Sequence, residues 1–152
     1  MKLISLFSGA GGFDLGFSRA GFDIIWANDY EPSVRSTYEL NHPSTTFCPQ
    51  SIVNIPSEDI PECDGIIGGP PCQSWSIGGS QKGINDPRGK LFFEFERIIR
   101  DKQPKFFLAE NVKNMTSKQN IQAFRNIKRR FRALNYTVRS KTLNAWDYDV
   151  PQ

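Results

Sequence analysis

The chain has 152 residues, of which 38% are hydrophobic and 23% charged, and its formal net charge at pH 7 is +3. This length suits one folded domain, and the apolar content excludes a disordered or collagen-like chain, because burying that much apolar area offsets the entropy lost on folding. No apolar run approaches the ~20 residues that a membrane-spanning helix needs, and Asp14 interrupts the first run too early for a secretory signal, so we expect a cytosolic protein.

The charge is unevenly distributed along the chain. Residues 1–96 contain six Lys and Arg against twelve Asp and Glu, whereas residues 97–141 contain thirteen against two. A basic cluster attracts polyanions such as nucleic acids, but a charge run is also typical of a solvated helix face. Charge alone therefore leaves both interpretations open.

The cysteines predict neither a metal site nor a disulfide framework. Cys48, Cys63 and Cys72 form no CxxC pair, and the sequence has a single histidine, His42. Zinc sites and disulfide scaffolds need closely spaced or more numerous ligands, so a reducing compartment fits best. We expect Cys48 and Cys63 to be buried structural thiols and His42 to be a loop residue.

Short apolar runs alternate with stretches of helical periodicity, which is the pattern of a parallel α/β sheet. The first half of the chain predicts, in order, a strand over residues 3–7, a helix ending near residue 20, a strand over 24–27, a helix over 32–40 and a short strand near 46–47. The second half predicts a strand over 65–68, a long loop over 73–90, a helix from 91 to about 103, a strand over 106–109, an amphipathic helix over 121–134 and a half-buried strand over 136–143. A glycine-rich loop of that length is typical of a functional segment.

The segment Ser8-Gly9-Ala10-Gly11-Gly12 joins the first predicted strand to the first helix. Glycines let a backbone approach a ligand closely, and a helix N-terminus favours negative charge. The dinucleotide pattern GxGxxG fails because Asp14 occupies its third glycine position, which argues against a pyrophosphate and leaves room for an amino-acid-like cofactor end. Asp29 follows the second strand, where a carboxylate can accept both ribose hydroxyls, although a capping or surface role is equally open for it alone. Together these features favour a nucleoside cofactor.

Two side chains at predicted strand ends are candidates for catalysis. Cys72 follows the rigid pair Pro70-Pro71 after the strand over 65–68, and Glu110 directly follows the strand over 106–109. Sheets of this class place their chemistry at the carboxyl ends of the strands. The alternatives are a buried structural cysteine and an exposed or ion-paired carboxylate.

Four motifs, in order and at family spacing, resemble those of the DNA (cytosine-5) methyltransferases: Phe7-Ser8-Gly9-Ala10-Gly11-Gly12, Gly69-Pro70-Pro71-Cys72-Gln73-Ser74-Trp75-Ser76, Asp86-Pro87-Arg88-Gly89-Lys90-Leu91 and Glu110-Asn111-Val112. The run is most similar to bacterial restriction-modification methylases of the GGCC-recognising kind and covers essentially the whole chain. The resemblance implies an α/β, Rossmann-like S-adenosylmethionine-dependent methyltransferase fold, with a mostly parallel twisted sheet, helices on both faces, and a location in the bacterial cytosol.

The resemblance also implies S-adenosylmethionine as cofactor, double-stranded DNA as substrate, and no metal. It assigns Cys72 as the nucleophile and Glu110 as the group that holds and protonates the target cytosine. The cofactor-binding residues that it implies are Phe7, Gly9, Gly11, Gly12, Asp29, Tyr30, Ser51, Ile52, Pro71 and Leu91. The substrate-binding residues that it implies are Gln73, Ser74 and Asn111.

The chain departs from the family pattern in two places. Gln50-Ser51-Ile52 lacks the acidic residue that the family places after its third strand, so we expect weaker adenine recognition. Gln152 is similar to the first residue of the family's QxRxR motif, so we expect residues 1–152 to be the N-terminal part of the catalytic domain, truncated before the final strand.

The target-recognition domain and C-terminal motifs would then be absent, and we expect the chain to be inactive alone. Open alternatives are a split-enzyme subunit completed by a second chain, a truncated gene product, a non-catalytic cofactor- or partner-binding module, and an RNA cytosine-5 methyltransferase.

Overall fold

A parallel β-sheet organises the first of the two units into which the chain divides, Met1–Asn111, and the second unit is Val112–Gln152. The computed structural model describes residues 1–71, 87–118 and 120–150, apart from the side chains of residues 87–90. Within these stretches no helix is both long enough and apolar enough to cross a bilayer.

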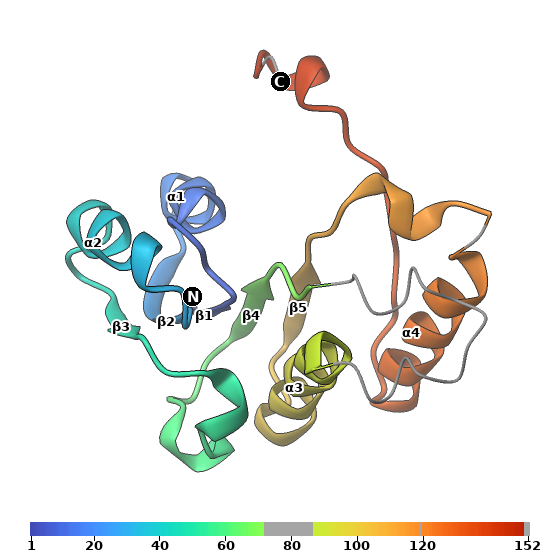
Figure 1. Ribbon diagram of the computed structural model, residues 1–152, viewed down its shortest axis with the longest axis horizontal. Coiled ribbons are helices and arrows are strands. Elements are labelled where there is room, and N and C mark those ends of the chain that lie inside the picture. Colours follow the sequence, from blue (N-terminus) through green and yellow to red (C-terminus); the bar gives the residue numbers. More distant parts are fainter. Residues whose placement is uncertain (72–86, 119, 151–152) are drawn as a thin grey trace. The chain divides into compact units, whose positions relative to one another are not determined.

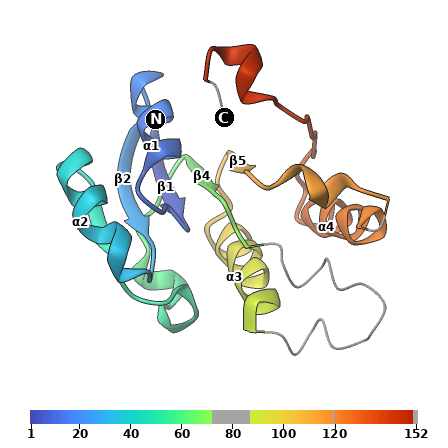
Figure 2. The same cartoon turned by 45° about the horizontal axis from the view of Figure 1, so that its top comes forward.

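The described sheet has five strands in the order β3-β2-β1-β4-β5, and every neighbouring pair is parallel. The strands are β1 (Lys2–Leu6), β2 (Asp23–Asn28), β3 (Thr46–Cys48), β4 (Gly65–Gly68) and β5 (Phe106–Ala109). Figure 2 shows β2, β1, β4 and β5 following one another across the sheet. These strands confirm the first five predicted from the sequence.

Helices cover both faces of the sheet, as predicted. Figure 1 shows α1 (Gly12–Arg19) and α2 (Pro32–Asn41) on one side and α3 (Pro87–Lys102) on the other. Right-handed crossovers place connections on opposite faces when the chain moves in opposite directions from β1. The helix expected from Leu91 begins earlier, at Pro87, because proline has the φ angle of a first helical turn. Residues 87–90 therefore belong to a helix and not to the predicted loop.

The core of this unit lies on both faces of β1 and β4: Leu3 and Ile67 pack on the face of α1, and α3 covers the other. The strands contribute fully buried aliphatic side chains, and α3 adds an apolar stripe: Leu3, Ile4, Leu6, Ile66, Ile67, Phe92, Phe95, Ile98 and Ile99. Both faces of a central parallel strand are covered, so such strands are continuous apolar runs. Two short 3-10 helices, η1 (Ile52–Asn54) and η2 (Ser57–Asp59), connect β3 to β4.

The described cysteines are less buried than the sequence suggested. Cys48 and Cys63 are free thiols of intermediate exposure. Cys48 is the last residue of β3 and Cys63 precedes β4, so neither lies within a buried apolar run. Burial nevertheless raises the pKa of the Cys63 thiol to about 11, and Glu62 acts in the same direction. A thiol with so high a pKa is a poor nucleophile at neutral pH.

The second unit contains η4 (Lys113–Thr116), α4 (Ile121–Ala133) and η5 (Ala145–Tyr148). The amphipathic helix is confirmed: Ile127 and Phe131, one turn apart, are buried, while Arg129 and Arg132 are exposed. The strand predicted over residues 136–143 is wrong, because that segment has no regular secondary structure. A strand needs a neighbouring strand for its backbone hydrogen bonds, and no strand among the described residues pairs with residues 136–143.

Candidate active site

The loops after four strands begin side by side at the carboxyl edge of the sheet. In the sheet register the last residues of these strands lie opposite one another, namely Leu6, Asn28, Gly68 and Ala109. The residues that start the four loops are Phe7, Asp29, Gly69 and Glu110. Motifs far apart in the sequence therefore meet along one edge.

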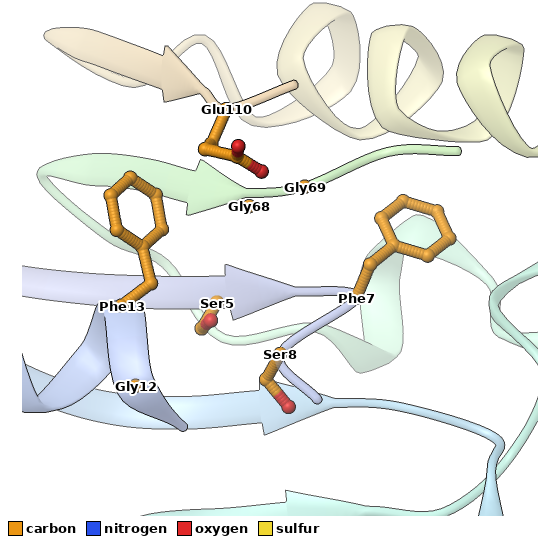
Figure 3. Close-up of a pocket in the computed structure, with 8 residues that line it drawn as sticks. All are labelled: Ser5, Phe7, Ser8, Gly12, Phe13, Gly68, Gly69 and Glu110. Carbon is orange, nitrogen blue, oxygen red and sulfur yellow. The ribbon is translucent and has the colours of Figure 1, made fainter. Parts of the chain in front are cut away.

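A pocket of about 380 Å³ opens at this edge between β1 and β4. Figure 3 shows the residues that line it: Ser5, Phe7, Ser8, Gly12, Phe13, Gly68, Gly69 and Glu110. From β1 the strand order runs to β2 and β3 on one side and to β4 and β5 on the other. Open α/β sheets bind ligands at such a reversal point.

The glycine turn forms one wall of the pocket. Gly9 and Gly11 have positive φ angles of 54° and 87°, and the Gly11 N–H donates to the Ser8 carbonyl at 3.0 Å. Because α1 begins at Gly12, its unpaired N–H groups lie beside the pocket. The Ser8 hydroxyl is buried without a hydrogen-bond partner among the described residues. A buried donor next to a helix N-terminus fits a ligand that ends in a carboxylate.

Asp29 connects the glycine turn to the loop after β2. Its Oδ2 accepts a hydrogen bond from the Gly9 N–H at 2.8 Å, and its Oδ1 accepts one from the Glu31 N–H at 2.9 Å. Each carboxylate oxygen has a second acceptor position, so ribose hydroxyls can still bind there. Tyr30, the next residue, is exposed.

The loop after β3 is held by a buried amide that the sequence reasoning missed. The side-chain nitrogen of Asn28 donates to the carbonyls of Cys48 and Gln50 at 2.9 and 2.7 Å. Ser51 follows as the N-cap of η1, and the side chain of Ile52 is buried. The segment predicted to contact adenine therefore has a defined backbone.

Arg97 of α3 supports the same segment from behind. Its guanidinium donates to the carbonyls of Ile52 at 3.1 Å and Ile55 at 2.9 Å, and to the Ser57 hydroxyl at 2.7 Å. It also pairs with Glu94 at 2.7 Å. No sequence pattern identifies these partners, since the carbonyls lie more than forty residues away.

Glu110 and Asn111 connect β5 to the segment after β4. The Glu110 N–H donates to the Gly68 carbonyl at 2.9 Å, and Figure 3 shows its carboxylate beside Gly69. Asn111 Nδ2 donates to the Pro70 carbonyl at 2.7 Å. The residues that precede Cys72 are thus tied to the strand that presents Glu110. Cys72, Gln73 and Ser74 themselves lie outside the described residues.

The structure brings together only part of the predicted cofactor set. Phe7 and Gly12 line the pocket, and Gly9, Gly11 and Asp29 form the adjoining turn. The described lining does not include Tyr30, Ser51, Ile52, Pro71 or Leu91, and their roles stay predictions. His42 is a correction: the expected loop residue is buried as the C-cap of α2, because its ring packs against Tyr38.

Comparisons with known proteins agree with this geometry. The C-5 cytosine-specific DNA methylase family matches residues 1–152. The chain is 60% identical over 152 residues to the Type II methyltransferase M.FnuDI of Fusobacterium nucleatum, which covers 100% of this chain and 44% of that protein. It is 52% identical over 153 residues to M.NgoPII of Neisseria gonorrhoeae, covering 100% of this chain and 45% of that protein.

A crystal structure described as a DNA modification methyltransferase encoded within an E. coli prophage has a similar fold, with a TM-score of 0.73. It is 32% identical and covers 88% of this chain and 38% of that chain. The chain therefore spans less than half the length of these relatives.

Proposed function

The chain belongs to the C-5 cytosine-specific DNA methylase family, and we propose that it is the N-terminal, cofactor-binding part of the catalytic domain of a DNA cytosine-5 methyltransferase. The observation that carries this proposal is the pocket at the β1/β4 reversal, lined on one side by the glycine turn and on the other by Glu110. The turn that would hold one end of a cofactor and the carboxyl group that would act as an acid therefore face the same pocket.

S-adenosylmethionine is the proposed cofactor, and when bound it supplies an electrophilic methyl group on a sulfonium centre. The buried Ser8 hydroxyl and the N-terminus of α1 fit its amino-acid end, and Asp29 fits its ribose. The aromatic ring of Phe7 lines the same pocket. Tyr30, Ser51, Ile52, Pro71 and Leu91 would complete the site around the adenine.

The proposed chemistry divides between a thiolate and an acid. Carbon 5 of cytosine is a poor nucleophile, so Cys72 adds at carbon 6 while Glu110 protonates N3 and takes up the developing charge. Carbon 5 then becomes nucleophilic enough to accept a methyl group. Loss of the carbon 5 proton afterwards expels Cys72. The target base must leave the duplex for this attack, and Gln73, Ser74 and Asn111 are the proposed substrate contacts.

The test is a substitution of Cys72 in the complete methylase. We expect Cys72→Ala to abolish methyl transfer to duplex DNA and Cys63→Ala to retain it, because only the first thiol is proposed to attack the base. DNA containing 5-fluorocytosine should form an adduct with the parent that survives denaturation, since fluorine cannot leave as a proton. Retained methylation by Cys72→Ala would refute the assignment. Duplexes containing GGCC are the first target to compare with other sequences.

A non-catalytic role for the isolated chain is the second candidate, favoured by its coverage of 44% of M.FnuDI. We propose that the 152 residues bind S-adenosylmethionine but need further residues, on the same or a second chain, to methylate DNA in the bacterial cytosol. Calorimetric titration of the 152-residue chain beside a methyl-transfer assay decides this point. Binding without transfer supports the proposal, and transfer by the chain alone contradicts it.

A further inference from the structure

Next to the glycine turn lies a cluster of buried polar side chains that have no role in the proposed chemistry. Its members are Ser5 of β1, Asp14 of α1, Tyr38 of α2 and His42 at the C-cap of α2, all between 0% and 6% exposed. Polar groups are rarely buried to this degree unless hydrogen bonds hold them there. Of the four, only Ser5 lines the pocket in the described residues.

The carboxylate of Asp14 is the centre of this cluster. Ser5 Oγ donates to its Oδ1 at 2.6 Å, and the Tyr38 hydroxyl donates to its Oδ2 at 2.5 Å. Burial raises the pKa of Asp14, while these two hydrogen bonds act in the opposite direction. A buried carboxylate without such donors is strongly unfavourable. The pair of bonds therefore ties the first turn of α1 to both β1 and α2.

His42 contacts the glycine turn directly. Its Nε2 lies 3.0 Å from the carbonyl oxygen of Gly11, so the tautomer protonated at Nε2 donates a hydrogen bond there. Its ring stacks on Tyr38 with a centroid separation of 4.6 Å. A Cβ atom at Gly11 would lie 2.3 Å from the same Nε2. The ring thus occupies the space beside Gly11 that a side chain would need.

Gly11 is the residue at which the turn becomes a helix. It has a φ of 87° and is the N-cap of α1, and its carbonyl also accepts the Leu15 N–H at 2.9 Å. Fixing this carbonyl fixes the direction of the first helical N–H groups and the place of Ser8, whose carbonyl accepts the Gly11 N–H. Both features form the wall of the pocket.

We propose that Tyr38 and His42 are positioning residues for the cofactor site, which hold the glycine turn in its ligand-binding conformation through Asp14 and Gly11. The identity of the ligand as S-adenosylmethionine rests on the proposed function. Without these contacts the turn samples other conformations. Only molecules in the ligand-binding conformation can bind, so the apparent affinity falls in proportion to the fraction of molecules in that conformation.

The experiment compares variants that differ in these contacts but not in overall packing. Tyr38→Phe removes only the hydroxyl, and His42→Leu removes the donor to Gly11. His42→Gln retains an N–H donor at a similar reach. Ile99→Val, in the fully buried part of α3 away from the turn, is the control for a loss of stability without a loss of these hydrogen bonds.

Two measurements on the 152-residue chain are informative. Calorimetry gives the dissociation constant for S-adenosylmethionine, which we expect to rise about tenfold in Tyr38→Phe and His42→Leu, the factor for one buried hydrogen bond, and to remain near the parent value in Ile99→Val. His42→Gln should recover most of the affinity. Amide hydrogen exchange without ligand should be faster at Leu15 in Tyr38→Phe than in the control.

The two outcomes separate this inference from the proposed function. If the parent binds the cofactor and Tyr38→Phe binds as tightly as Ile99→Val, the positioning role is wrong and the proposed cofactor site stands. If the parent does not bind, the proposed cofactor site fails. In that case the exchange rate at Leu15 still decides whether Tyr38 holds the turn, and an unchanged rate overturns the inference.

Discussion

Gly11 is the residue of the glycine turn whose replacement by alanine should be most damaging. Three neighbouring glycines differ sharply in their surroundings although all belong to the same motif. Gly9 has a φ of 54° and open space around its missing side chain, whereas Gly12 has open space and no positive φ. Gly11 combines a φ of 87° with buried ring atoms of His42 at 2.3 and 2.6 Å from an added Cβ.

These differences predict an order of stability losses. An alanine in the left-handed region is strained by about 1–2 kcal/mol, which is the whole effect expected for Gly9→Ala. In Gly11→Ala the same strain adds to about 1–3 kcal/mol of overpacking against the ring and about 1 kcal/mol for the lost His42 hydrogen bond, or about 3–6 kcal/mol in total. Gly12→Ala is helical and unobstructed, so we expect it to be neutral or to stabilise by up to about 1 kcal/mol.

The assay is equilibrium unfolding of the three variants in urea, followed by far-ultraviolet circular dichroism at neutral pH. The free energy of unfolding should fall far more for Gly11→Ala than for Gly9→Ala. A total stability of about 5–15 kcal/mol makes the larger loss easy to detect. If Gly11→Ala and Gly9→Ala lose the same amount within about 1 kcal/mol, the His42 ring yields freely and the reasoning on its packing is refuted.

Three further predictions concern other parts of the site. Burial raises the pKa of Asp14 above its ordinary 3.8, so the protonated side chain contributes its full stability below pH 3.8, and this contribution is lost as the pH rises through the native pKa. The free energy of unfolding of Asp14→Asn in urea should lack this decline. Parallel pH curves for the parent and the variant would contradict the prediction. Arg97→Met should lower the free energy of unfolding by about 2–3 kcal/mol, since it removes the guanidinium hydrogen bonds to the carbonyls of Ile52 and Ile55 and leaves Glu94 without its ion-pair partner. Arg100→Met should change it by less than about 1 kcal/mol. Glu110→Gln in the complete methylase should slow methyl transfer at least about 100-fold while cofactor binding persists, and near-normal turnover would exclude Glu110 as the acid.

Local patterns in the sequence were sufficient for most of the secondary structure. β4 and β5 begin and end where their apolar runs do, and α4 buries Ile127 and Phe131 at helical spacing. The position of Glu110 after a strand could be predicted for the same reason, because strand ends are marked by the loss of apolar residues. Period and composition are properties of neighbouring residues, so they can be read without a fold.

The tertiary structure alone decided which distant groups meet. His42 reaches Gly11 across 31 positions, and Arg97 reaches the carbonyl of Ile52 across 45. Neither partner has a local pattern that reveals it, because side-chain hydrogen bonds depend on how helices pack onto the sheet. Residues 136–143 show the same limit in reverse: their alternation matches a strand, yet a strand exists only where a neighbour supplies its hydrogen bonds. The amino-acid sequence by itself therefore determined most helices and strands and their apolar faces. The packing of the helices onto the sheet determined which distant side chains and backbone groups form hydrogen bonds.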